Sequence, residues 1–160
     1  MIVVADSGPL HYLILLDQAP LLHRFYGRVL VPEAVAVELR AARAPQPVRA
    51  WMFHPPSWIE IAPVSANEMA PINGELGLGE RAAIALAERV HAELMLIDET
   101  EGRIEAARRG LRVTGTLGVL LAAAEEGLVD VPDVLNRLAA TTFYADERLL
   151  TKVFGKWLGA

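Results

Sequence analysis

Short runs of uniformly apolar residues recur along the sequence, and longer segments with helical periodicity separate them. The clearest runs are residues 2–5 (Ile-Val-Val-Ala) and 94–97 (Leu-Met-Leu-Ile). A strand that is apolar on both faces must be covered on both faces, and strands that alternate with helices form parallel sheets. Further strands are expected at residues 29–31, 58–62 and 112–114. The pattern predicts one α/β domain over residues 1–160, with a central parallel sheet of about five strands.

Helices are expected between these strands, at about residues 7–16, 19–26, 32–42, 80–91, 100–109, 116–126, 132–140 and 146–158. Ser7 and Thr116 are predicted to cap the helices that begin there, because a hydroxyl oxygen can accept a hydrogen bond from a first-turn N–H group. The segment Ala44-Pro-Gln-Pro47 is rich in proline, which predicts a loop within the domain.

Composition excludes several classes of protein. The chain has no cysteine, which removes thiolate zinc sites, cysteine nucleophiles and disulfide frameworks and fits a reducing compartment. No apolar run approaches the ~18 residues that span a bilayer, and no basic segment typical of a secretory signal precedes the first strand. A cytoplasmic location is therefore the expectation. Because hydrophobic residues make up 53% of the chain, we also expect a covered apolar surface, including residues 116–126, and a homodimer.

The charge balance constrains the way in which a nucleic acid could bind. The chain has 15 basic and 20 acidic residues, a net charge of −5, which argues against binding through bulk positive charge. All basic residues except Lys152 and Lys156 are arginine, which suits bidentate phosphate contacts. The candidates are Arg40, Arg43 and Arg103. The alternative is that these arginines form solvated helix faces or reflect a compositional bias.

Two aspartates directly follow the two most apolar strands. Asp6 follows residues 2–5, and Asp98 follows residues 94–97. Open α/β sheets bind ligands at the carboxyl ends of their strands, where the strand order reverses. The alternative for each aspartate is that it caps the next helix, but their shared position after buried strands favours a functional site.

Two glutamates are predicted to lie on inward faces of their helices. Their neighbours three and four positions away are small or apolar, and a carboxylate there is costly unless something compensates it. For Glu80, the alternative is a first-turn acid that interacts with the helix dipole. The neighbours are Ala34, Val35, Ala41 and Ala42 for Glu38, and Ala83, Ile84 and Ala87 for Glu80.

Four converging carboxylates would repel one another strongly. At 4 Å and an effective dielectric constant near 20, each like-charged pair costs roughly 4 kcal/mol. Such a cluster must take up protons or bind a cation, and an all-oxygen ligand set favours Mg²⁺ or Mn²⁺ over zinc. Carboxylates that hold such ions meet the requirement for metal-assisted phosphodiester cleavage.

Several segments together resemble the PIN domain family, over nearly the whole chain from Ile2 to about Leu138. Two further segments resemble a PIN subfamily related to the toxins of bacterial toxin–antitoxin pairs: Thr-Gly-Thr-Leu-Gly-Val-Leu-Leu at 114–121 and Glu-Gly-Leu at 126–128. The order and spacing of the segments carry the resemblance rather than any single motif. The main segments are Val-Ala-Asp-Ser at 4–7, Val-Pro-Glu-Ala-Val-Ala-Val-Glu at 31–38, Gly-Leu-Gly-Glu at 77–80 with Ala-Ile-Ala-Leu-Ala at 83–87, and Leu-Ile-Asp-Glu at 96–99.

The resemblance implies an α/β/α sandwich, Mg²⁺- or Mn²⁺-dependent ribonuclease activity, an RNA substrate and a cognate antitoxin. It places catalysis and metal binding on Asp6, Glu38, Glu80 and Asp98, the same residues that the burial argument selects. The third acid is aspartate in many PIN toxins and Glu80 here. Ser7 and Thr116 could support a metal-bound water or a phosphate, and Arg103 could contact one.

Two other functions remain as alternatives. One is a catalytically weak PIN-fold module that binds nucleic acid or protein. The other is a receiver-like phosphoacceptor domain, which would require an adjacent acidic pair early in the chain and a lysine late in it. Both lysines, Lys152 and Lys156, lie in the last predicted helix.

Overall fold

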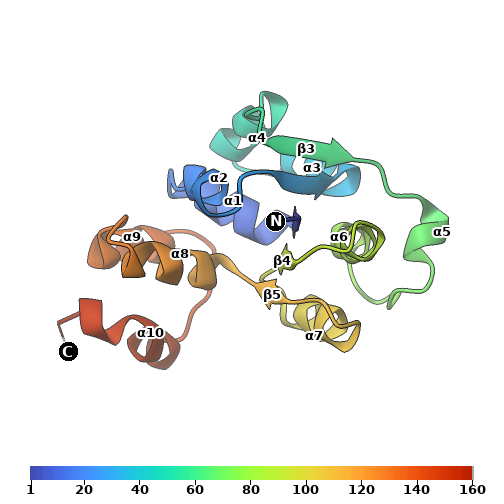
Figure 1. Ribbon diagram of the computed structural model, residues 1–160. Coiled ribbons are helices and arrows are strands. Elements are labelled where there is room, and N and C mark those ends of the chain that lie inside the picture. Colours follow the sequence, from blue (N-terminus) through green and yellow to red (C-terminus); the bar gives the residue numbers. More distant parts are fainter. Residues whose placement is uncertain (160) are drawn as a thin grey trace.

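A five-stranded parallel sheet forms the centre of the computed structural model, which describes residues 1–159 (Figure 1). Its strand order is β3-β2-β1-β4-β5, and every neighbouring pair is parallel. The predicted parallel α/β sheet is confirmed. The strands are β1 (Val3–Ala5), β2 (Val29–Pro32), β3 (Ile59–Ala62), β4 (Leu94–Leu96) and β5 (Val113–Thr114).

The helices follow the predicted positions to within a few residues, with two additions, α4 and α5. The full set is α1 (Ser7–Leu15), α2 (Pro20–Tyr26), α3 (Glu33–Arg40), α4 (Gln46–Phe53), α5 (Ala66–Met69), α6 (Leu78–Arg89), α7 (Thr100–Arg108), α8 (Thr116–Glu125), α9 (Val131–Ala139), α10 (Glu147–Phe154) and the 3₁₀ helix η1 (Gly155–Trp157).

Local chemistry explains both additional helices. The prolines of the expected loop start α4: Pro45 is its N-cap residue and Pro47 lies in its first turn, where a fixed φ and a missing N–H group cost nothing. Helix α5 begins with a reciprocal cap, in which the Ser65 hydroxyl accepts from Glu68 N–H at 3.2 Å and Glu68 Oε1 accepts from Ser65 N–H at 3.0 Å. A Ser-x-x-Glu sequence is the usual sign of such a start.

Helices cover both faces of the sheet and make three layers. Alternate residues of β1 face opposite sides: Val3 and Ala5 join one hydrophobic core, and Val4 joins the other. The first core includes apolar residues from α1, α2, α8, α9 and α10, and the second includes residues from α6 and α7. Figure 1 shows these two sets on opposite sides of the strands.

Most of the apolar residues of α8 are buried within the chain, while Leu117 and Leu121 are half-buried. Val119, Leu120 and Ala123 are fully buried, and the helix packs against α1 and α2. The exposed large apolar side chains lie elsewhere, among them Val37, Leu78 and Tyr144. The composition of α8 therefore gives no separate support to the expected homodimer. Among residues 1–159, no helix is long and apolar enough to cross a membrane.

Candidate active site

The strand order reverses between β1 and β4, and the two predicted aspartates follow these strands. From β1 the chain builds the sheet outward through β2 and β3, and it returns to the other side of β1 with β4 and β5. Ligands bind at the carboxyl ends of strands at such a point. A cleft of about 700 Å³ lies there, and Asp6, Glu38, Glu80 and Asp98 all line it. The fold therefore brings the four predicted acids to one cleft.

Asp6 is a buried carboxylate with an unsatisfied oxygen. Its side chain is 2% exposed, and it occupies the N-cap position of α1 without making a capping hydrogen bond. Oδ1 is buried and has no hydrogen-bond partner. Helix capping thus does not account for Asp6, and Ser7, predicted to cap α1, is the first residue inside the helix. Buried polar atoms without a partner are rare and costly, so Asp6 is suited to take up a proton or a cation.

The surroundings of Asp6 raise its pKa to about 7. Burial is the main cause, because it disfavours the charged form. The backbone N–H of Ser7 opposes this effect, and the negative charges of Glu80, Glu38 and Asp98 add to it. The three other acids are therefore close enough to Asp6 to act on it electrostatically.

Asp98 is held by Thr116, at the start of α8. Its Oδ1 accepts from the Thr116 backbone N–H at 2.7 Å, and its Oδ2 accepts from the Thr116 hydroxyl at 2.7 Å. Asp98 therefore does not cap α7, whose N-cap residue is Glu99. The prediction that Thr116 caps α8 is also wrong, since Gly115 is the N-cap residue. Thr116 is fully buried and positions Asp98 rather than facing a substrate.

The pKa of Asp98 is raised, mainly by burial. The two hydrogen bonds from Thr116 and the positive charge of Arg103 lower it, and Glu99 raises it. Two glycines allow the chain to approach this carboxylate closely. A Cβ atom on Gly8 would lie 2.9 Å from Asp98 Oδ2, and one on Gly115 would lie 2.5 Å from Oδ1. Asp98 thus sits between the first turn of α1 and the start of α8.

Glu38 lies in the cleft but is exposed, so its predicted inward position is wrong. Helix α3 buries Val35, Ala36 and Leu39 instead. The helix ends at Arg40. Ala41 and Ala42 lie beyond its end, so they do not share a helix face with Glu38 as expected. A Cβ atom on Gly79 would lie 2.9 Å from Glu38 Oε2 and 3.6 Å from Asp6 Oδ1. The bare backbone of Gly79 therefore leaves both oxygens facing the same small space.

Glu80 has a structural role in addition to its place in the cleft. Its Oε1 accepts from the Gly77 backbone N–H at 3.2 Å, which agrees with the alternative of an acid that serves the helix start. Burial raises the pKa of Glu80, the Gly77 N–H lowers it, and the charges of Glu99 and Glu38 raise it. Glu80 thus stabilises the start of α6 by its bond to Gly77 and adds negative charge to the cleft.

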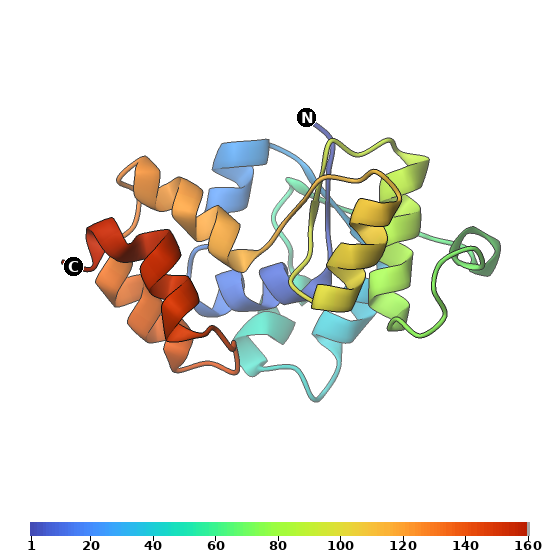
Figure 2. The same cartoon turned by 90° about the horizontal axis from the view of Figure 1, so that it is seen from below.

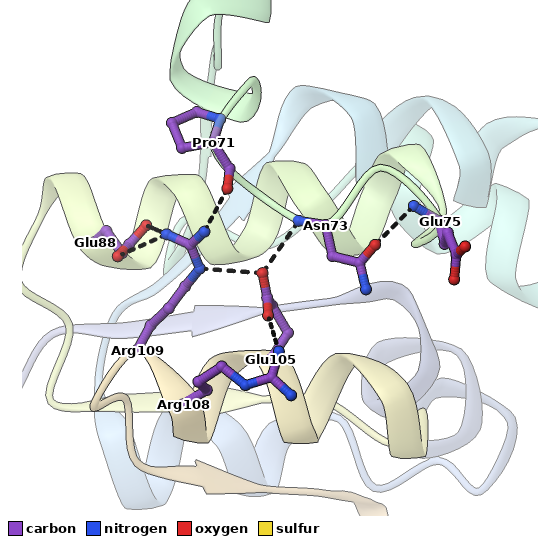
Figure 3. Close-up of polar contacts among 7 residues, drawn as sticks. All are labelled: Pro71, Asn73, Glu75, Glu88, Glu105, Arg108 and Arg109. Atoms are coloured by element: carbon purple, nitrogen blue, oxygen red, sulfur yellow. Dashed lines mark hydrogen bonds and ion pairs between the residues drawn. The ribbon is translucent and has the colours of Figure 1, made fainter.

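A network of ion pairs and hydrogen bonds fixes the loop that leads to Glu80 (Figure 3). Glu105 of α7, 6% exposed, accepts from the Asn73 backbone N–H at 3.1 Å and from Arg109 Nε at 3.2 Å. Arg109 also donates to the carbonyl of Pro71 at 2.6 Å and to Glu88 of α6 at 3.0 Å. Helices α6 and α7 together therefore hold residues 71–77, just before the start of α6.

The predicted arginines differ in their surroundings. Arg43 is exposed and lines the acidic cleft. Arg103 lines a neighbouring pocket and donates to the carbonyl of Ile97 at 2.9 Å. Arg40 donates to the carbonyl of Met52 at 3.1 Å, and its guanidinium lies 5.8 Å from the ring centre of Phe53. Arg40 lines neither the cleft nor that pocket.

Sequence reasoning missed three polar or charged side chains of the cleft: His11, Tyr12 and Glu99. His11 lies four residues after Ser7 on α1, so helical spacing places it on the same face as Ser7. Burial lowers the pKa of His11, and the charge of Glu38 raises it. That spacing was the available signal for His11, and Glu99 is simply the neighbour of Asp98.

The donor set fits a divalent cation that prefers oxygen. Carboxylate oxygens are the ligands that Mg²⁺ and Mn²⁺ favour, and the unpartnered Oδ1 of Asp6 supplies a free acceptor. Within residues 1–159, however, no three Asp, Glu, His or Cys side chains converge as a complete metal site. Glu38 is exposed and has room to adjust its side chain.

Comparison with known proteins identifies the family. A family model described as "PIN domain" matches residues 2–158. A solved structure, a PilT N-terminus domain protein from the hyperthermophilic archaeon Sulfolobus solfataricus P2, is similar with a TM-score of 0.55 and 14% identity, covering 77% of this chain and 93% of that one. At this identity the likeness supports the fold alone. No curated protein matches the sequence. The family match and the shared fold show that the chain belongs to the PIN domain family.

Proposed function

We propose that this chain is a metal-dependent endoribonuclease that cleaves phosphodiesters in single-stranded or structured RNA. PIN domains are generally nucleases and typically use divalent metals. The observation that carries the proposal to this chain is the buried, unpartnered Oδ1 of Asp6, in a cleft lined by three further acids. A carboxylate in that position is costly to the fold, and binding a cation would offset the cost.

Each acid would have a distinct role. Asp6 and Asp98 would hold Mg²⁺ or Mn²⁺ directly, and Glu38 and Glu80 would complete its coordination or orient water. When bound, the ion would lower the pKa of the attacking water and offset negative charge on the scissile phosphate. Asp6, with its pKa near 7, would release its proton as the cation binds. Thr116 would keep Asp98 in one orientation, and Ser7 could hold a water or a phosphate oxygen.

A second candidate is a catalytically weak PIN-fold module that binds RNA or protein. It is favoured by the hydrogen bonds that Asp98 accepts from Thr116, because they use one lone pair on each carboxylate oxygen and so reduce its capacity to bind a metal. It is also favoured by the open arrangement of the acids, since within residues 1–159 no three of them converge on one point. This candidate predicts weak metal binding together with intact RNA binding.

An RNA cleavage assay separates the two candidates. Labelled single-stranded and hairpin RNAs are incubated with the purified chain in Mg²⁺, Mn²⁺ or EDTA. The nuclease proposal expects cleavage that requires metal, is lost in Asp6→Asn and Asp98→Asn, and persists in Glu33→Gln, which removes an exposed charge at the start of the same helix as Glu38. RNA that is bound but stays intact in both metals would support the binding module instead.

We further propose that the chain is a cytoplasmic toxin-like PIN protein with a cognate antitoxin. Val37 and Leu78 line the cleft and are 60% and 54% exposed, so an apolar partner segment could cover the acids and these side chains together. Co-purification with the product of an adjacent small gene, coupled to loss of RNA cleavage, would support this partner. Cleavage unaffected by that product would contradict it.

We also propose a homodimer, because a chain with a mean hydropathy of +0.31 and several exposed large apolar side chains has apolar surface available for association. Light scattering at tens of micromolar tests this. A mass of two chains is expected, and a mass of one chain would contradict it.

A further inference from the structure

A second pocket, of about 710 Å³, adjoins the acidic cleft. The two share Tyr12, Asp98 and Glu99 as lining residues, so they are continuous across these side chains. Residues of α8 and α10 also line the second pocket, and Figures 1 and 2 show these two helices in the same part of the molecule as the carboxyl terminus. A ligand in the acidic cleft could therefore extend into the second pocket.

The lining of this pocket differs from that of the cleft. Its lining combines aliphatic side chains, aromatic side chains and threonines. Its volume is in the range of sites that enclose small organic groups. The aliphatic residues are Leu117, Leu121, Leu149 and Val153, the aromatic residues are Tyr12, Phe143 and Tyr144, and the threonines are Thr100, Thr114 and Thr142.

Contacts with α1 hold part of the aromatic lining in place. The rings of Tyr12 and Phe143 pack edge to face with centroids 5.0 Å apart, and the hydroxyls of Tyr12 and Thr142 form a hydrogen bond at 3.0 Å. These contacts hold Thr142 and Phe143 against α1, the helix that follows Asp6. The neighbouring Tyr144 is 88% exposed, so most of its ring is open to a ligand.

Arg103 lines the second pocket together with Asp98, which the two sites share. Its Nη1 donates to the carbonyl of Ile97 at 2.9 Å, and its positive charge lowers the pKa of Asp98. Because this backbone contact anchors one end of the guanidinium, the cation is held in the second pocket near Asp98. A phosphate that passes from the cleft toward the pocket would meet it.

We propose that this pocket binds one unpaired nucleobase of single-stranded RNA, next to the phosphodiester held in the acidic cleft. The proposal rests on the proposed ribonuclease function and adds the substrate feature that the site reads. Unpaired bases stack on aromatic side chains, whereas bases within a duplex are covered by their neighbours. The base stacks on Tyr144 beside the aliphatic side chains of the pocket, and Arg103 contacts an adjoining phosphate.

The test measures RNA binding, so it does not depend on cleavage. All proteins carry Asp6→Asn to keep the RNA intact, and the probes are short labelled oligoribonucleotides in which one abasic residue is moved along the strand. Tyr144→Ala is expected to weaken binding at least about fivefold, and Tyr144→Phe to preserve it. At one position along the strand, the abasic residue should weaken binding to the protein that keeps Tyr144. The same abasic RNA should bind Tyr144→Ala no more weakly than the intact RNA does.

Controls separate the pocket from general effects. Phe53→Ala removes another exposed ring, 57% exposed and outside both sites, and should leave affinity unchanged. Far-UV circular dichroism checks that each variant folds. Equal affinity for Tyr144→Ala and its parent, or equal losses at every abasic position, would overturn the proposal. A Tyr144→Ala change that alters the oligomeric state and leaves the RNA affinity unchanged would also overturn it, since the ring would then serve a contact between protein chains.

Hydrolysis of bis(p-nitrophenyl) phosphate by the chain without the Asp6 change separates this proposal from the proposed function. Only the wild-type chain is assayed with this substrate, in Mn²⁺ and in EDTA, so the result tests the acidic cleft without any change at Tyr144. Metal-dependent hydrolysis with RNA binding that ignores Tyr144 would overturn the base pocket and leave the nuclease standing. Base-dependent binding without any hydrolysis would support the pocket and overturn the nuclease.

Discussion

Asp98 and Thr116 are joined by two hydrogen bonds of 2.7 Å, one from the backbone N–H and one from the hydroxyl of Thr116. The pair connects the end of β4 to the start of α8, which follows β5. Because both donors favour the charged form of the carboxylate, they counteract the effect of burial on its pKa. Thr116 thus orients an acid of the proposed active site and opposes the rise of its pKa.

Removal of the Thr116 hydroxyl should destabilise the chain. Thr116→Val keeps the shape and the backbone N–H but loses the hydrogen bond to Asp98 Oδ2, which should lower the free energy of unfolding by about 2 kcal/mol. Urea denaturation measures the change. Thr100→Val is the matched control, because Thr100 is the exposed first residue of α7. Equal stabilities of the two variants would contradict the role of the hydroxyl.

In the absence of metal, Asp6 should make stability fall as the pH rises. Its pKa is raised from 3.8 to about 7 in the folded chain, so between these values the folded state holds a proton that the unfolded state has lost. The free energy of unfolding then decreases as the pH rises through this window. Asp6→Asn should remove this decrease. Above pH 7 its free energy of unfolding should exceed that of the wild type by about 4 kcal/mol.

Denaturation in EDTA over a pH series measures this difference. Glu33→Gln, an exposed acid outside the cleft, serves as the control and should show no comparable trend. A wild-type chain that gains stability relative to Asp6→Asn as the pH rises from about 4 to 7 would contradict the pKa of Asp6.

Arg43 and Arg103 should each contribute one phosphate contact to RNA binding. With a net charge of −5, the chain depends on local cations, so the salt dependence should be shallow. Replacing either arginine by alanine should weaken binding to all RNA sequences alike and reduce the salt slope by roughly 0.7. Arg112→Ala is the control, because exposed Arg112 precedes β5 and lies at the opposite end of the strands. Losses confined to one RNA sequence would contradict a phosphate contact.

Glu105 should stabilise the loop before α6. The Asn73 N–H is the main cause of its lowered pKa, and Arg109 and Arg108 add to the effect. Glu105→Gln should therefore lower the melting temperature at neutral pH. The difference should shrink as the pH falls through 4.5 and below, where the wild-type carboxylate takes up its proton. Glu101→Gln, on the exposed face of the same helix, is the control, and an equal effect of both changes would contradict the network.

The strands and the two aspartates were predictable because the reasons for them are local. An apolar run followed by an acid identifies a buried strand and its carboxyl end, as at Asp6 and Asp98. Local signals for α4 and α5 are also present in the sequence. Pro45 precedes α4, but a proline-rich segment predicts a loop as readily as a helix start. The Ser65–Glu68 pair is the signal for α5.

Other features of the site depend on contacts between distant segments. The bond from Asp98 to Thr116 joins residues 18 positions apart and follows from the pairing of β4 with β5. Glu38 was expected to point inward because the helix was expected to reach Ala42. Its actual end at Arg40 changes which neighbours share a face with Glu38. Tyr144 lines the second pocket only because the segment before α10 returns to α1, where Phe143 packs against Tyr12.

The most direct test of the central claim is the melting temperature of the chain with and without Mn²⁺. A ligand that binds only the folded state stabilises it by mass action, and the cation would relieve the cost of burying Asp6 beside three other acids. We expect millimolar Mn²⁺ to raise the melting temperature of the wild type and to have no effect on Asp6→Asn combined with Asp98→Asn. An unchanged melting curve for folded wild-type protein in Mn²⁺ would contradict the metal site.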